Sequence, residues 1–441
     1  MRAVASLAQR LTAVLPAGTA LVGAGLGVLG LAAYVFLAIA GHTLDPADYS
    51  DLAVLWMIVF SLGPGLFFPF EQELGRLVAA HRAEQTGAGP MIAQIAQVGL
   101  AVLAGLLVIT FALRQPLATS LFNGDARLVD VLAVNLVALT AAHLSRGLLA
   151  GHGHFGRYGS QLAADGVLRV VLAALLAAAG VRHAVGYGLV LAVAPLVAVL
   201  LTFHPGLLRT APGPRIPYSG VVVRLGLLVA SSTFWLAIVN AGVVTAKLVA
   251  PPAQVELAGA LLSGLVLARI PLFVFSSVQA SLLPALSAAA AAGEREGFGR
   301  LVTRTTVAVV GLGAAGAVVC ITAGPWLVRV LFGTGAGLDR VDFAWLAGAT
   351  TVYMVATVLG QAGLALAGHR DQALGWAAGF LVLVGVTALP VETLLRVELA
   401  FLAGSAVAGT LLGVRLLRRL RRWPEHPGVA SPTASTSGFV D

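Results

Sequence analysis

The sequence predicts an all-α integral membrane protein with about twelve transmembrane helices in two parallel six-helix lobes around a central cavity. Of its 441 residues, 59% are hydrophobic and only 10% are charged, whereas soluble chains carry about 25% charged residues. Apolar stretches of roughly 20 residues recur along nearly the whole chain, and each is long enough to cross the hydrocarbon core. Similar segments also return after a little over 200 residues. Together these observations exclude an ordinary water-soluble protein.

The spans follow from the apolar runs between charged or Pro/Gly-rich breaks. The first six lie near 20–41, 51–70, 90–113, 128–150, 159–180 and 184–204, and the second six near 220–249, 255–283, 301–324, 343–367, 372–390 and 395–417. The first run is longer than a signal-peptide core, so we expect a retained span. The predicted units are an N-terminal lobe (1–210), a linker (211–219), a C-terminal lobe (220–422) and a disordered cytoplasmic tail (423–441).

Internal repeats support the two lobes. "LFNGDARLVD" (121–130) leads through an apolar span to "LLAGHGHFGRY" (148–158), as "LFGTGAGLDRVD" (331–342) leads to "LALAGHRDQ" (364–372). With six spans per unit, both copies enter the membrane from the same side. We therefore expect parallel repeats related by an axis along the membrane normal, with a cleft between them.

The distribution of basic residues predicts the orientation, because cytoplasmic loops collect Lys and Arg. With the N-terminus inside, 18 of the 27 Lys and Arg residues fall on the inner side and 7 on the outer side. This predicts a multi-pass protein of the cytoplasmic membrane with both termini cytoplasmic. The net charge of +8 points to membrane phospholipid as counter-charge and not to nucleic acid, because the arginines lack aromatic interleaving. "RLLRRLRRW" (415–423) suits an anionic inner leaflet or a plain topology anchor.

Several sequence motifs give only weak evidence for a metal or nucleotide site. Cys320 is the single cysteine, which excludes disulfides and thiolate metal sites within one chain. His152 and His154 have a metal-like spacing, but no carboxylate or cysteine lies nearby in sequence, so we expect a polar turn and no metal. Two glycine patterns (25–30 and 311–316) resemble a dinucleotide fingerprint without the strand that it requires, so we interpret them, together with Gly23, as helix-packing glycines.

Charge at membrane depth is the most informative chemistry, because an arginine at the centre of a span costs about 2.5–3.5 kcal/mol on insertion scales. Arg269 lies near the middle of the eighth span without a local acid. We expect it to face the cleft, where it could hold a substrate phosphate. Arg169 lies in the fifth span with Asp165 one turn earlier. That pair either eases insertion or faces a wet cavity and changes partners during transport.

Other polar residues complete the candidate site. His143, Asn240 and Gln279 lie at membrane depth, where they serve either helix packing or the cavity. The segment "FFPFEQELGRLVAAHR" (67–82) reads as the inner end of the second span. There Glu71, Glu73 and Arg76 can share a helical face and neutralise one another, or form a cytoplasmic gate. Lys247 is expected to snorkel at the outer end of the seventh span.

The chain resembles the MOP superfamily of exporters and, within it, the polysaccharide transporter group of lipid-linked oligosaccharide flippases. The resemblance covers roughly residues 15–420 and rests on the span count, the two lobes, "LDPADYSDLAVLW" (44–56), "RGLLAGHGHFGRYG" (146–159) and "LARIPLFVFSSVQASLLPALS" (267–287). It implies alternating access by two rocking lobes. Drug-exporting relatives carry an acid in the first span, which is absent from 20–41, and the peptidoglycan-precursor branch has extra spans.

Taken together, these expectations predict that the protein is a transporter and not an enzyme. The anticipated substrate is a lipid-linked oligosaccharide whose pyrophosphate meets Arg269 and Arg169, while its sugar hydroxyls meet Asn240 and Gln279. We expect no cofactor. The identity of a coupling ion, H⁺ or Na⁺, stays open, and glycosyltransferases of the same pathway are the anticipated partners. Three alternatives stay open: a multidrug or small-metabolite exporter of the same fold, a membrane-bound glycan-processing enzyme, and a structural membrane scaffold.

Overall fold

A computed structural model describes residues 19–83, 87–208, 218–251, 256–332, 338–366, 368–421 and 423. Every regular element in this part of the chain is a helix. The arrangement follows from the sequence, since the apolar runs are separated by prolines, glycines and charged residues that cannot continue a membrane helix.

The first half contains the elements of the predicted N-terminal lobe. In chain order they are α2 (Thr19–Thr43), α3 (Pro46–Leu62), the π-helical turn η1 (Gly63–Phe67), α4 (Phe68–Ala83), α5 (Gly89–Ala112), α6 (Arg114–Leu121), α7 (Ala126–Gly151), α8 (Phe155–Ala178), α9 (Ala184–Thr202) and the short 3₁₀ helix η2 (Pro205–Leu208). The second span is longer than expected, because α3, η1 and α4 form one continuous apolar rod over Pro46–Val78.

The second half contains seven helices among the described residues. They are α10 (Tyr218–Val249), α11 (Leu257–Ala268), α12 (Ile270–Ala291), α13 (Arg295–Phe332), α14 (Arg340–Ala365), α15 (His369–Val386) and α16 (Thr393–Arg421). Local signals set several ends. At the start of α14, for example, the side chain of Asp339 accepts hydrogen bonds from the backbone N–H groups of Val341 and Asp342, and the side chain of Asp342 accepts one from the backbone N–H of Asp339.

Ten of the described helices are long and apolar enough to cross a membrane, which identifies the chain as a multi-pass membrane protein. The expected eighth span differs from the prediction of a single helix, because it is broken at Arg269 into α11 and α12. Pro271 explains the break, since a proline has no backbone N–H to donate and crowds the preceding turn. With α11–α12 counted as one span and α15 as another, helices occupy all twelve expected segments.

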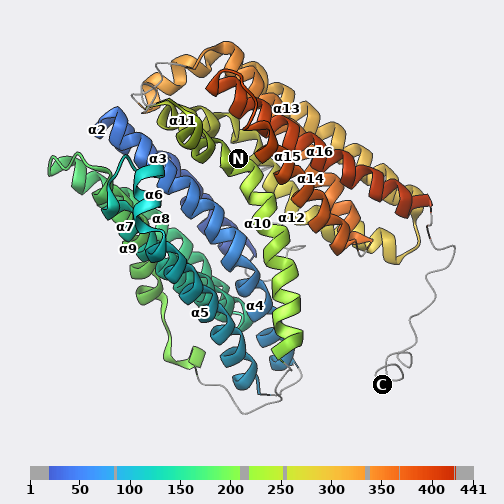
Figure 1. Ribbon diagram of the computed structural model, residues 1–441. Coiled ribbons are helices and arrows are strands. Elements are labelled where there is room, and N and C mark those ends of the chain that lie inside the picture. The colour runs from blue at the N-terminus through green and yellow to red at the C-terminus, as the bar shows by residue number, and fades with distance from the viewer. Residues whose placement is uncertain are drawn as a thin grey trace, which may run out of the picture.

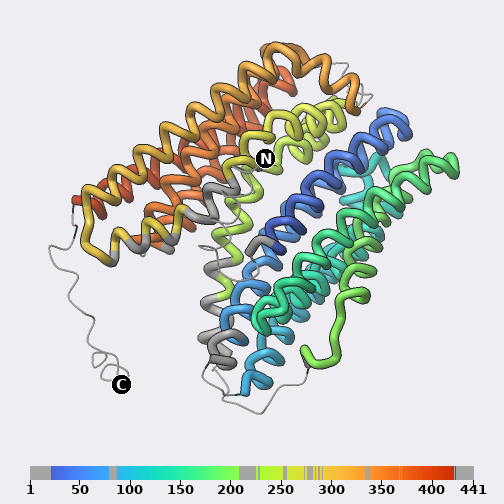
Figure 2. Tube along the Cα trace, turned by 180° about the vertical axis from the view of Figure 1, so that it is seen from behind, coloured from blue at the N-terminus to red at the C-terminus, as the bar shows by residue number. Residues whose placement is uncertain are grey.

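The helices form two bundles that converge at one end and diverge toward the other (Figures 1 and 2). The α2–α3, α8–α9 and α15–α16 turns lie at the converging end, which we name the outer end because the arginine distribution predicts that it faces outward. The opposite, inner end carries the α12–α13 turn. The predicted linker lies almost wholly outside the described residues, so the domain limits stay a prediction.

Helix α10 runs between the two bundles (Figure 1) and contacts both. Its first half adds Leu225 to an apolar cluster with Phe70 and Leu74 of α4. Further along, the ring of Phe234 lies 5.5 Å from that of Phe380 on α15. The outer half of α10 therefore packs with the C-terminal bundle.

Only some of the predicted packing glycines pack. Gly25 lies against the backbone of Gly159, and Gly316 lies against the ring of Pro271. Nothing lies within 4 Å of the position that a Cβ would take at Gly23, Gly27, Gly30 or Gly311, so the packing prediction is wrong for these four. The α2–α8 contact depends on Gly25 of α2 and on two glycines of α8, because Gly159 lies against the backbone of Leu21 and Gly166 against that of Leu29.

Candidate functional site

Arg269 occupies the break between α11 and α12. Its backbone N–H still bonds to the carbonyl of Leu265, while its side chain is buried with 8% exposure. Among the described residues, Nε and Nη2 have no hydrogen-bond partner. A buried guanidinium with two nitrogen atoms that lack partners is poorly compensated, and it is suited to receive an anion.

Asn240 of α10 supplies the partner that Arg269 does have. Nη1 of Arg269 donates to Oδ1 of Asn240 at 3.0 Å and lies 3.8 Å from Sδ of Met57 on α3. The amide nitrogen of Asn240 is 3.5 Å from the backbone carbonyl of Phe60, also on α3. The arginine is therefore buried among helices of both bundles, and its facing a cleft stays a prediction.

The Asp165–Arg169 pair forms as predicted from its spacing on α8. Nε of Arg169 lies 2.7 Å and Nη2 3.0 Å from the two oxygens of Asp165, and both side chains are buried. The third nitrogen, Nη1, has no partner in the described chain. The guanidinium carbon lies 5.8 Å from the ring centroid of Phe60, which is a cation–π distance.

Phe60 consequently connects the two arginine sites. Its ring lies under Arg169 of the N-terminal bundle, and its carbonyl faces Asn240, which binds Arg269. We name Asp165, Arg169, Asn240 and Arg269 the arginine site. It holds two guanidinium groups and one carboxylate, so its formal charge is positive.

His143 does not belong to this site. Its Nδ1 lies 2.7 Å from Oε2 of Glu71 on α4, and Nε of Arg146 donates to the same oxygen at 3.1 Å. The hydroxyl of Tyr158 donates to Oε1. Because this carboxylate is fully partnered, the cluster ties α4, α7 and α8 together within the N-terminal bundle.

The predicted neutralisation among Glu71, Glu73 and Arg76 is confirmed for Glu73 and Arg76 but does not include Glu71. Arg76 pairs with Glu73 at 2.7 Å in an exposed position, whereas Glu71 is 5% exposed and turns inward. Burial of one face of α4 separates the two glutamates. A gate that includes Glu71, Glu73 and Arg76 stays a prediction. The side chain of Gln279, on α12, lies outside the described residues.

The sequence reasoning missed Asp51 and misassigned Lys247. Lys247 does not snorkel: its Nζ lies 2.7 Å from Oδ1 of Asp51 on α3, and both side chains are buried. The available signal was that Lys247 is the only lysine and that Asp51 opens an apolar span. A charged residue kept inside a membrane helix calls for a partner.

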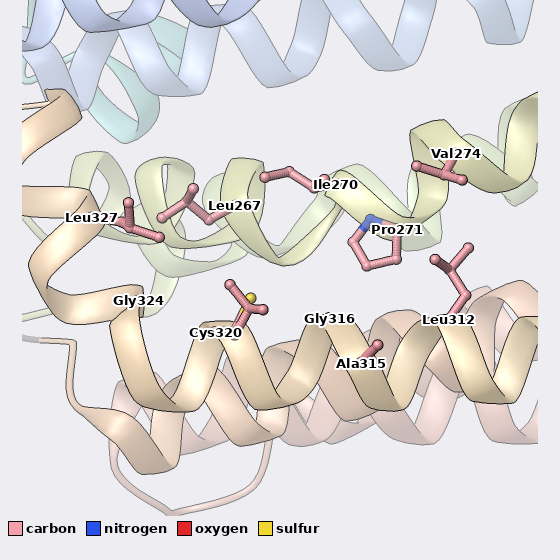
Figure 3. A pocket seen from close by; sticks show the side chains of 11 residues that line it. Leu267, Ile270, Pro271, Val274, Leu312, Ala315, Gly316, Cys320, Gly324 and Leu327 are labelled. Carbon is pink, nitrogen blue, oxygen red and sulfur yellow. The ribbon is translucent and has the colours of Figure 1, made fainter. Parts of the chain in front are cut away.

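A cavity of about 230 Å³ lies beside the helix break, between α11–α12 and α13. Figure 3 shows its walls, which include Leu267, Ile270 and Pro271 on one side and Leu312 and Cys320 on the other. No charged side chain lines it. It can therefore receive hydrocarbon but not the anion that Arg269 would bind.

The turn between α7 and α8 contains His152 and His154, whose spacing in the sequence resembles that of metal ligands. The rings of His152 and His154 lie 6.2 Å apart, as do those of His154 and His204. Within the described part of the chain, no group of three or more His, Cys, Asp or Glu residues is placed to hold a metal ion.

No family model matches the chain. It is 28% identical over 429 residues to the uncharacterized protein Rv3630 of Mycobacterium tuberculosis (strain ATCC 25618 / H37Rv), with 93% of both chains covered. It is also 28% identical over 412 residues to the uncharacterized protein Rv1510 of the same strain, covering 90% of this chain and 91% of that one.

Solved structures show the fold. A multidrug resistance MATE family transporter of the MOP superfamily in its inward-facing conformation superposes with a TM-score of 0.73 at 12% identity, covering 90% of this chain and 94% of that chain. Its outward-facing conformation gives 0.65 at 13% identity, covering 91% and 94%. A mutant of the Vibrio cholerae MATE transporter VcmN gives 0.65 at 16% identity, covering 96% and 99%. The chain therefore has the MATE transporter fold.

Proposed function

We propose that this protein is an alternating-access transporter that moves a lipid-linked oligosaccharide across the cytoplasmic membrane. The fold supports the transport class, because the solved structures that share it are transporters in both inward-facing and outward-facing conformations. The substrate class goes further than the fold and depends on the charge of the arginine site.

The observation that carries the substrate proposal is Arg269. A guanidinium buried between two bundles, with Nε and Nη2 unpartnered in the described chain, gains most from a phosphate oxygen. Arg169 adds a second guanidinium, which lies over the ring of Phe60, and its Nη1 has no partner among the described residues. A pyrophosphate headgroup has the charge and the acceptor oxygens to use both, and the amide of Asn240 can exchange its bonds with sugar hydroxyls.

The multidrug alternative is favoured by the names of the solved neighbours, which describe multidrug resistance transporters. Charge argues against a cationic drug here. The described helix α2 contains no acidic residue, and the one carboxylate of the arginine site, on Asp165, is already paired. A cation would enter a site with excess positive charge and no free carboxylate.

The conformation supports an inward-facing state. The bundles diverge toward the inner end (Figures 1 and 2), and the arginine distribution predicts that this end is cytoplasmic. The TM-score to the inward-facing transporter exceeds that to the outward-facing one, 0.73 against 0.65. A lipid-linked precursor made in the cytoplasm would meet the transporter in this state.

The test is a flipping assay with purified protein in phospholipid vesicles. The probe is a polyprenyl-pyrophosphate disaccharide with a fluorescent sugar, and a membrane-impermeant reductant reports the fraction exposed outside. Arg269→Gln should abolish flipping, and Arg269→Lys should retain part of it, since a lysine keeps the charge without the planar fork. Arg300→Gln is the matched control, because Arg300 is exposed and pairs with the exposed Glu296 at 3.3 Å.

Two results would count against the proposal. Equal flipping by wild type and Arg269→Gln would remove the arginine from the mechanism. Active transport of a cationic dye by the wild type, with no flipping of the probe, would establish the multidrug alternative.

A further inference from the structure

The outer end of the molecule contains a buried ion pair between the two bundles. Nζ of Lys247, near the end of α10, lies 2.7 Å from Oδ1 of Asp51, near the start of α3. Their side chains are 7% and 10% exposed. Since the outer half of α10 packs with the C-terminal bundle, this pair joins the two moving parts of the proposed transporter.

Asn123, in the N-terminal bundle, donates hydrogen bonds to the carboxylate of Asp51. Its amide nitrogen lies 3.1 and 3.3 Å from the two oxygens of Asp51. The residue has a positive φ of 49° and precedes Gly124 at 90°, a left-handed turn that asparagine and glycine tolerate. Asp51 and Asn123 belong to the same bundle, so Asp51 keeps this donor when Lys247 moves away.

Neutral contacts accompany the ion pair at the same end. The hydroxyls of Tyr49 on α3 and Ser263 on α11 lie 3.1 Å apart. Gly41, near the end of α2, packs closely on the backbone of Phe332 at the end of α13. These contacts require the bundles to touch, and the ion pair is the charged contact among them.

We propose that Lys247 and Asp51 form the latch that keeps the outer end closed in the inward-facing state. This inference rests on the proposed alternating access and adds the gate that the site needs. When the bundles separate at the outer end, water reaches both ions, and Asp51 retains Asn123. The ion pair therefore stabilises the closed state of the outer end. The open state stays accessible, because the free energy of desolvating the two ions offsets part of their Coulombic attraction.

The pair can be tested by a distance measurement across the outer end that needs no substrate. Spin labels are attached to Cys introduced at Arg182 and at Leu389 in a Cys320→Ser background. These exposed residues lie in the α8–α9 and α15–α16 turns. Pulsed electron resonance of protein in lipid nanodiscs then reports how the labels are distributed in distance.

Asp51→Asn and Lys247→Gln should each raise the long-distance population about tenfold, the shift expected from losing a state-specific contact. The charge swap Asp51→Lys with Lys247→Asp should restore the short distance. Asp130→Asn is the matched control, because Asp130 pairs with Arg114 at 2.6 Å within one bundle and should leave the distance unchanged.

Chemical labelling gives a second measurement, because Lys247 is the only lysine. An amine-reactive ester should modify Lys247 slowly in the wild type and at the same rate in the Asp130→Asn control, with the terminal amine as internal standard. Asp51→Asn should raise the labelling rate of Lys247 about tenfold, in parallel with the distance change.

The outcomes separate the latch from the proposed function. Unchanged distances in both single variants would overturn the latch, even if Arg269→Gln abolishes flipping. Longer distances with restoration by the swap would support the latch, even if the lipid-linked probe is not the substrate. A swap that stays at the long distance would show that another property of the two residues, and not their pairing, closes the outer end.

Discussion

Nη1 of Arg269 donates a hydrogen bond of 3.0 Å to Oδ1 of Asn240, and this neutral amide is the hydrogen-bond partner that the structure gives a buried cation. An amide accepts the bond without cancelling the charge. The positive potential is thereby kept for a ligand, which a carboxylate at the same position would remove.

Asn240→Asp should reduce flipping of the pyrophosphate probe at least tenfold, because the new carboxylate pairs with Arg269 and repels the anion. Thermal unfolding in detergent should show no loss of stability, since the buried cation gains a counter-charge. Asn240→Ala is the control, as it removes the hydrogen bond but keeps the charge, and it should flip more probe than Asn240→Asp. Equal flipping by Asn240→Asp and the wild type would contradict this role.

Asp165→Asn should destabilise the protein by about 3–5 kcal/mol, because it leaves Arg169 buried without a counter-charge. The double variant Asp165→Leu with Arg169→Met should regain most of the free energy of unfolding, since it removes both ions. We expect the double variant to flip less probe, because it lacks the second guanidinium. Normal flipping by a stable double variant would show that the pair serves insertion alone. Denaturant unfolding and the vesicle assay measure the two effects.

Glu71→Gln and Glu73→Gln provide a matched comparison two residues apart on α4. Glu71 binds His143, Arg146 and Tyr158 in a buried cluster, so its loss should cost about 3 kcal/mol or more. Glu73 pairs with an exposed arginine, so its loss should change stability by less than about 0.5 kcal/mol. Thermal unfolding of both variants decides, and similar melting temperatures would refute the buried cluster.

Gly41→Ala should loosen the outer end, because the added methyl would collide with the backbone of Phe332. The spin-label distance between the outer turns should lengthen, and the melting temperature should fall. Gly27→Ala lies on the same helix with nothing within 4 Å of its Cβ position. It should keep the wild-type distance and gain up to about 1 kcal/mol from helix propensity. A similar effect of both substitutions would exclude the close contact as the cause.

The order and extent of the helices could be predicted because they depend on local properties. Apolar runs and Pro/Gly breaks place all twelve spans, and the four-residue spacing of Asp165 and Arg169 predicts their pair correctly. The break at Arg269 was missed although Pro271 stands two residues later, because hydropathy alone does not register a lost backbone hydrogen bond.

The remaining contacts of the site could not be predicted because they join distant parts of the chain. Glu71 and His143 are 72 residues apart, and Asp51 and Lys247 are 196 apart. Helical periodicity reports only neighbours three or four residues away. Which of Glu71 and Glu73 turns inward depends on how α4 packs against α7, and this is decided by the tertiary fold.

Helix α13 contains 38 residues, so at about 1.5 Å per residue it measures roughly 57 Å. The hydrocarbon core is about 30 Å thick, so α13 must lean steeply or project into the headgroups. A lean of this size couples the C-terminal bundle to bilayer thickness through hydrophobic mismatch. Vesicles of longer-chain lipids should therefore favour a more upright bundle and, under the proposed alternating access, shift the balance between inward-facing and outward-facing states.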